Sequence, residues 1–455
     1  MASESRPGEP ASELIPGAPA PPAPADLAPI EESRRSLTMD ALRGFAVLGI
    51  LAMNIPGFAF PSLDFLDPRE GGITGWDGVV YLFNRLVFDL KMQSIFSMLF
   101  GAGLVVLTGR AAAAMRSPLP IFLRRVAVLA IFGLLHGYFL WYGDILWTYA
   151  VCGLLIYPLR KLRARWLLLI GVSLFVFGAV VLTGMGAGLW YIRDQADRAE
   201  ALVQAGGTPT AQQQEFVKAW HEARADFQPS EEKRRFEAEV HHGSYTDIVR
   251  YRAPSALAFQ IGFPFWSFSL FRFTGYMLIG IALMRLGVFR GGLSSRAYAL
   301  MAAVGYLIGM PVVYCGFEQA RAHDFDIVFT FLTGWQWNYI GSAFVAFGHI
   351  GALMLLFRSR VGTPITRALA AAGRLALTNY LTQSLLCNVI FFGWGFDLWN
   401  RCSRTEVELI AGGIWALQIA WSIAWLRFFR HGPFEWLWRS LTYGASPPMR
   451  RDRSH

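Results

Sequence analysis

Apolar runs of about twenty residues recur along the whole chain, and they restrict what it can fold into. A helix of about 20 residues crosses the hydrocarbon core of a bilayer. Of the 455 residues, 54% are hydrophobic and 16% are charged, whereas a soluble domain carries about 25% charged residues. The sequence therefore predicts an all-α, polytopic integral membrane protein that is solvated mainly by lipid.

The spacing of the runs predicts about ten transmembrane helices, separated by short loops and one long polar stretch. The predicted spans are 41–60, 79–108, 121–141, 145–159, 166–191, one within 257–286, 297–317, 339–357, 369–392 and 407–428. The second stays a single span, because splitting it would move Arg110 and Arg124 to the other side of the membrane. The fourth is short and requires residues 141–144 to form a tight outer turn.

The runs and the polar stretches between them divide the chain into regions. These are a Pro/Ala-rich cytoplasmic tail (1–36), an N-terminal membrane bundle (37–192), an extracytoplasmic polar segment (193–254), a C-terminal membrane bundle (255–444) and a basic cytoplasmic tail (445–455). The first tail lacks the basic start and short apolar run of a secretory signal and is predicted to be disordered. Within the polar segment, 215–227 has helical character, and Pro229-Ser230 could start another helix.

Arginine and lysine residues predict which side of the membrane each loop faces, because cytoplasmic loops carry an excess of them. Basic residues gather in the turn 160–165 and in the flanks on the same side. The short loops on the other side hold only Arg69, Arg321, Arg401 and Arg404. Both termini are therefore predicted to be cytoplasmic. The basic residues behind the net charge of +9 lie at helix ends. The expected partner is therefore membrane lipid, and no nucleic acid is expected to bind.

Familiar metal, redox and nucleotide motifs are absent from the sequence. The 4 cysteines show no paired spacing. The adjacent His241 and His242 would point about 100° apart on a helix, which is poor geometry for one metal ion. The sequence contains no phosphate-binding loop, HExxH, GxSxG or CxxC motif. No metal site is expected, and neither an ATP-driven pump nor a thiol enzyme is supported.

Polar residues of the first span are candidates for a site, because charge within a bilayer is costly. Asp40 and Arg43 have i, i+3 spacing, so they share a helix face and can pair. The pair could shape a cytoplasm-side pocket in which Arg43 meets a phosphate or carboxylate, or it could anchor the helix start. Asn54, deeper on the same helix, could bind a ligand or bridge helices.

Charged residues also fall inside later spans. Lys91 lies near the middle of the second span, Arg272 in the sixth and Arg374 in the ninth. On the ninth span, Asn379 and Gln383 share a face through i, i+4 spacing. These residues could line a substrate cavity, or they could lock helices together.

His136 and Asp144 flank the predicted turn between the third and fourth spans. Histidine suits general-base work near neutral pH. A carboxylate within reach could fix its tautomer and orientation. In the alternative interpretation, His136 is a satisfied interfacial side chain, and Asp144 caps the next helix. The sequence leaves both interpretations open.

Long segments of the chain resemble the YeiB-like family of uncharacterised bacterial polytopic membrane proteins. The resemblance lies in RRSLTMDALRGFAVLGILAMNI, KMQSIFSMLFGAG, LLHGYFLWYGDILWTYAVCGLLIYPLR and the stretch from GRLALTNYLTQSL to FEWLWRSLTYG. These segments span most of the chain, so the resemblance implies a bacterial inner-membrane protein with the family's C-terminal domain in its second half.

The first helix is also similar to that of a wider group of transmembrane acyltransferases, the heparan-α-glucosaminide N-acetyltransferase type. The similar residues are Asp40, Arg43, Gly44 and Asn54. This resemblance implies transfer of an acyl group from cytoplasmic acyl-CoA to an acceptor across the membrane. Those enzymes have a catalytic His shortly after the first helix. The corresponding loop here contains none, so His136 would have to substitute.

The residues and the resemblance together lead to a hypothesis of acyl transfer. Acyl-CoA would approach from the cytoplasm, where Arg43 and either Arg124 or Arg125 meet its phosphates. His136, oriented by Asp144, would deprotonate the hydroxyl or amine of a glycan or lipid acceptor, or would carry the acyl group itself. The sequence leaves open whether the protein forms a homo-oligomer.

Two other functions fit the same residues. A transporter or exporter of a small or amphiphilic solute would use embedded charges such as Lys91, Arg272 and Arg374 along its path. A scaffold protein would instead bind a partner through the polar segment 193–254.

Overall fold

The computed structural model describes residues 37–61, 67–69, 71–113, 115, 117–262 and 269–451. Within these ranges the chain forms helices joined by turns, and its only β pairing is an isolated bridge between Phe429 and Arg450. The predicted all-α membrane fold is therefore confirmed. The predicted tail 1–36 and the last residues of the tail 445–455 lie outside the described residues.

The helices belong to a membrane part and a polar part. The membrane part consists of α1 (Leu37–Asn54), α2 (Pro56–Ala59), α3 (Gly75–Val87), α4 (Lys91–Ala113), α5 (Leu119–Phe139), α6 (Leu146–Leu159), α7 (Ala164–Gln204), α12 (Phe271–Arg285), η4 (Val288–Arg290), α13 (Ser295–Ala322), α14 (Ile327–Phe329), η5 (Thr330–Gly334), α15 (Trp335–Arg358), α16 (Gly362–Arg374), α17 (Ala376–Phe391), α18 (Arg404–Phe428) and α19 (Pro433–Tyr443). The polar part consists of α8 (Ala211–Phe227), α9 (Glu231–His241) and α10 (Tyr245–Ile261).

Seven of the described helical stretches are long and apolar enough to cross a bilayer. They are Leu37–Ala59, Gly75–Gly109, Leu119–Phe139, Ala164–Gln204, Ser295–Ala322, Ile327–Arg358 and Arg404–Phe428. Each coincides with one of the ten predicted spans. The other three predicted spans contain shorter helices, because α6 has 14 residues and the runs 257–286 and 369–392 are interrupted. The number ten and the cytoplasmic termini stay predictions.

The predicted second span corresponds to one candidate span, Gly75–Gly109, but not to a continuous helix. It breaks between α3 and α4, where Leu90 adopts a left-handed φ of 63°. That conformation is costly for a residue with a side chain. The side chain of Arg272 stabilises it, since its Nη2 donates to the Leu90 carbonyl oxygen at 2.8 Å. The break exposes polar backbone that charged side chains satisfy inside the bundle.

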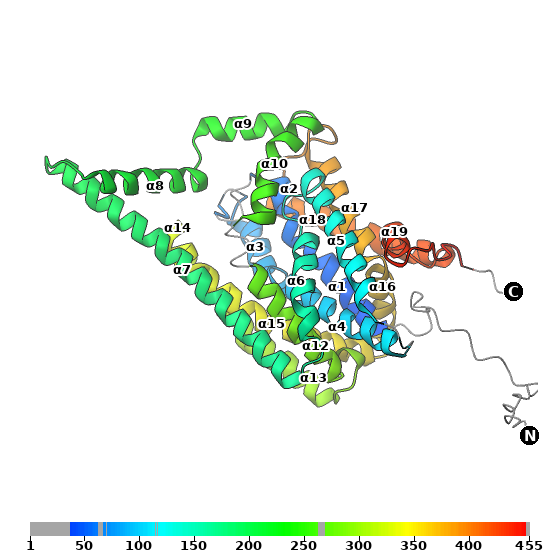
Figure 1. Ribbon diagram of the computed structural model, residues 1–455. Coiled ribbons are helices and arrows are strands. Elements are labelled where there is room, and N and C mark those ends of the chain that lie inside the picture. The colour runs from blue at the N-terminus through cyan, green and yellow to red at the C-terminus, as the bar shows by residue number, and fades with distance from the viewer. Residues whose placement is uncertain are drawn as a thin grey trace, which may run out of the picture.

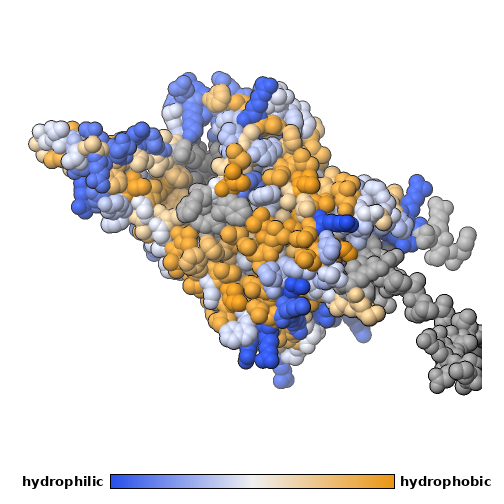
Figure 2. Space-filling model, viewed as in Figure 1, coloured by the Kyte–Doolittle hydropathy of each residue, from blue (hydrophilic) through white to orange (hydrophobic). Residues whose placement is uncertain are grey.

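Helix α1 lies at the centre of the bundle. In the most apolar 18-residue stretch of each helix, 78% is buried inside the protein for the span that contains α1, compared with 22% for α7 and for α13. Gly44 allows α16 to approach α1 closely, because a Cβ there would lie 1.9 Å from the carbonyl oxygen of Leu369. Figure 2 shows apolar residues across the middle of one face, between hydrophilic residues at the top and bottom of the view. This pattern is typical of a membrane protein.

The polar part extends from α7 and returns to cover the bundle (Figure 1). Helix α7 continues well beyond membrane length, α8 folds back from its far end, and α9 and α10 lead back to the bundle. The predicted helix at 215–227 lies within α8, and Ser230 caps α9 as expected. Val240 and Ile248 pack against Trp141 in the turn between α5 and α6. The polar part therefore covers that turn.

Candidate functional site

The turn between α5 and α6 places Asp144 inside the protein. One carboxylate oxygen, Oδ1, accepts a hydrogen bond from the Trp147 backbone N–H at 3.0 Å. Asp144 lies one residue before the N-cap position Ile145, so it is not itself the predicted N-cap, but it binds a backbone N–H in the first turn of α6. The other oxygen, Oδ2, faces α5 and lies 2.8 Å from Nδ1 of His136. The same carboxylate thus contacts the first turn of α6 and His136.

Ser384 on α17 extends the hydrogen-bonded pair of Asp144 and His136 to a chain of three side chains. Its Oγ lies 2.8 Å from Nε2 of His136. The exposed fractions are 0% for Asp144, 2% for His136 and 4% for Ser384. Because an ionised carboxylate only accepts hydrogen bonds, a neutral His136 donates from Nδ1 to Asp144 and accepts at Nε2 from the Ser384 hydroxyl. We call Ser384, His136 and Asp144 the relay.

Two further polar side chains lie beside the relay. The ring of Tyr380 packs 4.8 Å from that of His136, and its hydroxyl donates to Asp144 Oδ2 at 3.4 Å. Gln260 on α10 is buried, and its side-chain amide makes no hydrogen bond to the described residues. This amide lies close to Gly137, the neighbour of His136. Since burying an unpaired amide costs about 1–3 kcal/mol, a polar ligand group beside the relay would be stabilised there.

A cavity of about 650 Å³ opens at the end of the bundle where α1 begins. Its cationic lining consists of Arg43, Arg125, Arg290, Arg374 and Arg439. Its acidic lining residues are Asp40, which binds Arg43 at 2.8 Å, and Glu435, which accepts from the backbone at the start of α17. Five positive and two negative groups leave an excess of three positive charges. We call this the Arg-rich cavity.

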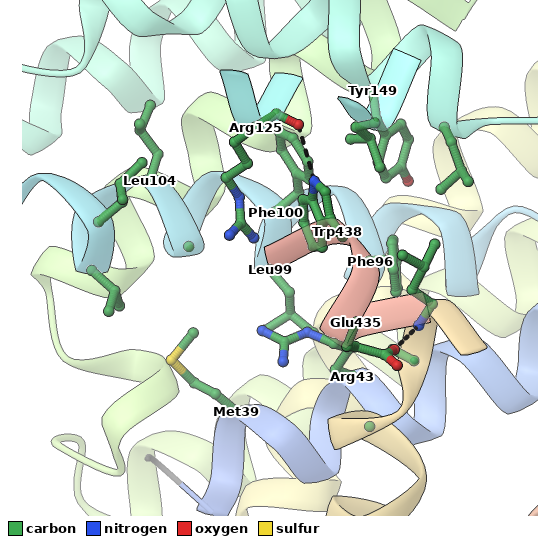
Figure 3. A pocket seen from close by; sticks show the side chains of 18 of the residues that line it. Met39, Arg43, Phe96, Leu99, Phe100, Leu104, Arg125, Tyr149, Glu435 and Trp438 are labelled. Atoms are coloured by element: carbon green, nitrogen blue, oxygen red, sulfur yellow. Dashed lines mark hydrogen bonds between the residues drawn. The ribbon is translucent and has the colours of Figure 1, made fainter. Parts of the chain in front are cut away.

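Figure 3 shows the guanidinium groups of Arg43 and Arg125 directed into the same open space. Arg125 also stacks 3.9 Å from the ring of Trp438 on α19. The deeper wall is apolar and aromatic, with Phe96 and Phe100 beside Tyr149. The cavity therefore offers positive charge at its mouth and an apolar interior, which suits an anionic ligand with an apolar arm.

A second cavity of about 740 Å³ lies toward the opposite end of the bundle, where α1 ends. Many of its lining residues are aromatic, so we call it the aromatic cavity; they include Tyr81, Trp141, Tyr142, Phe259, Phe273 and Trp335. Asn54, Arg85 and Asp89 supply polar groups. A largely apolar wall with a few polar groups is typical of a site for an amphiphilic molecule.

The two cavities approach each other at the relay. Ile145, next to Asp144, lines both of them. Trp141 and Gly143, on the other side of Asp144, line the aromatic cavity, whereas Tyr380 lines the Arg-rich cavity. The relay therefore lies in the wall that separates a basic cavity from an aromatic one.

The predicted binding residues divide between the cavities and the helix interfaces. Asp40, Arg43 and Arg374 line the Arg-rich cavity, and Asn54 lines the aromatic cavity. Arg124 is exposed and lies outside both linings, whereas its neighbour Arg125 faces the Arg-rich cavity.

Lys91 and Arg272 belong to a buried network at the break between α3 and α4. Lys91 Nζ donates to Asn338 Oδ1 at 2.7 Å, and Asn338 Nδ2 donates to Asp89 Oδ2 at 2.7 Å. Arg272 donates to Ser94 Oγ at 2.8 Å. These bonds support the interpretation that the two cations meet partners inside the bundle. Neither lines a cavity directly, although Asp89 and Asn338 do.

Asn379 and Gln383 face α1 and α18 and not a cavity. Asn379 Nδ2 donates to Ser422 Oγ at 3.1 Å, and Gln383 Nε2 donates to Gln418 Oε1 at 2.9 Å. Gln383 also donates to the Val47 carbonyl oxygen at 3.2 Å. Their contacts correspond to the helix-locking alternative.

The comparisons with known proteins place the chain among relatives of unknown function. An uncharacterized protein named YeiB in Escherichia coli (strain K12) is 32% identical over 428 residues, which are 91% of this chain and 98% of the relative. The chain belongs to the YeiB family. An uncharacterized protein named YxaH in Bacillus subtilis (strain 168) is 28% identical and covered to 98% of its length. No solved structure matches the chain.

One part of this YeiB-family chain also matches a defined family region. Residues 283–445 match the family described as a protein of unknown function (DUF418). That region contains Ser384 and three arginines of the Arg-rich cavity, Arg290, Arg374 and Arg439. His136 and Asp144 lie outside it, so the relay joins the matched region to the N-terminal bundle.

Sequence reasoning missed Ser384, Tyr380, Arg290 and Arg439. Ser384 sits in an apolar helix one residue after Gln383, and no motif marks it. Only the packing of α17 against α5 identifies it. In the described residues, no group of three or more His, Cys, Asp or Glu side chains could hold a metal ion.

Proposed function

We propose that this YeiB-family protein transfers an acyl group from cytoplasmic acyl-CoA to a hydroxyl or amine acceptor that binds in the aromatic cavity. The main observation behind this proposal is that the relay lies between two cavities with different chemical linings. A neutral His136 that accepts at Nε2 and is held by Asp144 at Nδ1 is arranged as a general base. Such a base contributes about 10²–10⁴-fold to a rate.

The Arg-rich cavity supports acyl-CoA as the donor. Acyl-CoA carries several phosphates and ends in an apolar acyl thioester. Guanidinium groups bind phosphates with bidentate, charge-assisted hydrogen bonds. The excess positive charge at the mouth would hold the phosphates, and the apolar wall near Phe96 and Tyr149 would receive the acyl arm. The excess of basic residues in the flanks on this side supports a cytoplasmic location for this cavity, in a protein of the bacterial inner membrane.

The experiment measures transfer from radiolabelled acyl-CoA to a panel of glycan and lipid acceptors by purified protein in proteoliposomes. We expect His136→Gln to reduce transfer by about 10²-fold or more. His349→Gln is the matched control, because His349 is also buried but bonds Tyr306 and the Val87 carbonyl oxygen, away from the relay. Equal rates for the wild type and His136→Gln would refute the proposal.

A second candidate function, solute transport, is favoured by one observation. Asp89 and Arg85 form an ion pair of 2.7 Å on the wall of the aromatic cavity, next to buried Lys91. Charges within a membrane bundle often mark a solute or proton path. Counterflow in proteoliposomes that needs Asp89 and Lys91 but no acyl-CoA would support transport. Acceptor labelling without counterflow would reject it.

A further inference from the structure

The relay has the connectivity of a hydroxyl nucleophile with its base and orienting acid. Ser384 Oγ, His136 and Asp144 are linked by two contacts of 2.8 Å, and all three are buried. Serine is a weak nucleophile until an adjacent base accepts its proton, and a third group commonly orients that base. Since Asp144 occupies Nδ1, only Nε2 can accept a proton, and Ser384 is the residue hydrogen-bonded there.

We propose that Ser384 is a catalytic nucleophile that carries the acyl group between the two cavities as an ester. This inference rests on the proposed acyl transfer and deepens it. Ser384 Oγ attacks the thioester carbonyl carbon, and its proton moves to His136 Nε2. The carbon–sulfur bond breaks, and the departing thiolate takes that proton and leaves as the free thiol of CoA. The acceptor hydroxyl or amine then attacks the ester, and His136 returns the acceptor's proton to Ser384 Oγ.

The position of Ser384 between the two cavities explains why an ester intermediate would be useful. Tyr380 lies one turn before Ser384 on α17 and lines the Arg-rich cavity. Ile145, beside Asp144, lines both cavities. Donor and acceptor therefore approach from different sides of the same wall. A covalent ester lets them react in turn, so neither has to cross the wall.

The buried amide of Gln260 is an independent sign that a polar ligand group belongs beside the relay. It has no hydrogen-bond partner within the described chain, and it lies against Gly137, whose Cβ position is also 3.6 Å from Asp144 Cβ. An ester or thioester carbonyl could accept from the Gln260 amide nitrogen, which would stabilise both the bound group and this side chain.

The test is to trap the ester. Purified full-length protein is incubated with acetyl-CoA without acceptor, and the intact mass and the peptide containing Ser384 are measured. We expect one acetyl group on Ser384, and none in Ser384→Ala or His136→Gln. Ser342→Ala is the matched control, because Ser342 is also buried in a helix but bonds its own helix at Tyr339. In Ser384→Cys, the acyl group becomes a thioester that neutral hydroxylamine removes.

A fluorophosphonate probe provides a second readout that does not depend on CoA. It should label Ser384, and the label should be lost in Ser384→Ala and reduced at least about 10²-fold in Asp144→Asn, where the histidine tautomer is no longer fixed. Transfer by Ser384→Ala at the wild-type rate would overturn the nucleophile and leave the proposed function standing. Absence of both transfer and labelling in folded wild type would overturn both.

Discussion

At the scale of single residues, neighbours in the sequence have unequal environments. Arg124 and Arg125 are adjacent on α5, yet Arg124 is exposed and Arg125 faces the Arg-rich cavity and stacks on Trp438. The sequence alone could not choose between them. The two arginines therefore form a matched pair, and only Arg125 should contribute to binding of acyl-CoA.

We expect Arg125→Gln to raise KM for acyl-CoA by about 10-fold, which corresponds to about 1.4 kcal/mol from one charge-assisted contact. Arg124→Gln should change KM by less than about two-fold, since a solvated surface charge contributes little. Initial rates over a range of acyl-CoA concentrations provide the measurement. Equal effects of the two substitutions would contradict the assignment of the Arg-rich cavity.

At the scale of helices, close approach depends on particular glycines. Gly44 on α1 faces the α16 backbone, whereas at Gly184 on α7 no atom outside the adjacent turns of its own helix lies within 4 Å of the Cβ position. We expect Gly44→Ala to destabilise the protein by about 1–3 kcal/mol through overpacking. Gly184→Ala should be neutral or slightly stabilising, because alanine favours a helix. Thermal unfolding in detergent would compare them, and equal melting temperatures would contradict the packing explanation.

The docking of α9 should depend on pH through His241. Burial first, and then the positive charge of Arg252, lowers the pKa of His241 to about 3. Its ring stacks 4.6 Å from that of Trp399. An unfolded His241 has a pKa near 6.5, so between this value and the folded-state pKa the unfolded segment binds more protons than the folded one. The contribution of His241 to stability is therefore complete above about pH 6.5 and is lost as the pH falls below it. The loss at pH 5 should be about 1–2 kcal/mol.

Hydrogen exchange of Glu231–His241 measures this dependence. Protection should decrease between pH 7 and pH 5 beyond the ordinary effect of pH on exchange chemistry. His241→Gln should remove the excess decrease. His221→Gln should retain it, because His221 is exposed on α8. A wild-type segment with unchanged corrected protection at pH 5 would reject the prediction.

At the scale of the whole molecule, one residue beyond each end of α7 tests the membrane orientation. In a cysteine-free background, we expect Lys161→Cys to be protected from an impermeant maleimide in intact cells. Lys218→Cys on α8 should react, because the polar part lies at the other end of α7 (Figure 1). The opposite pattern would invert the topology and move the Arg-rich cavity to the outside.

Much of this architecture could be predicted because membrane crossing leaves a local signal. An apolar run has the length of the bilayer, so seven predicted spans match long helices. His136 and Asp144 could be paired because they are only eight positions apart around a turn. The left-handed Leu90 and the break at Leu375, between α16 and α17, could not be predicted, because side chains of distant helices bind the backbone there: Arg272 at Leu90 and Glu435 at the start of α17. Ser384 likewise meets His136 across 248 positions, which no local pattern records.

The wide separation of the relay residues has a consequence for biogenesis. Helices α5 and α6 leave the ribosome and enter the membrane long before α17 is synthesised. A nascent chain therefore carries a base and its carboxylate partner, but it has no hydroxyl for them to activate. Under the proposed mechanism, reactive chemistry would arise only once translation is nearly finished and the two bundles have assembled, so truncated products inserted by the translocon would be inactive.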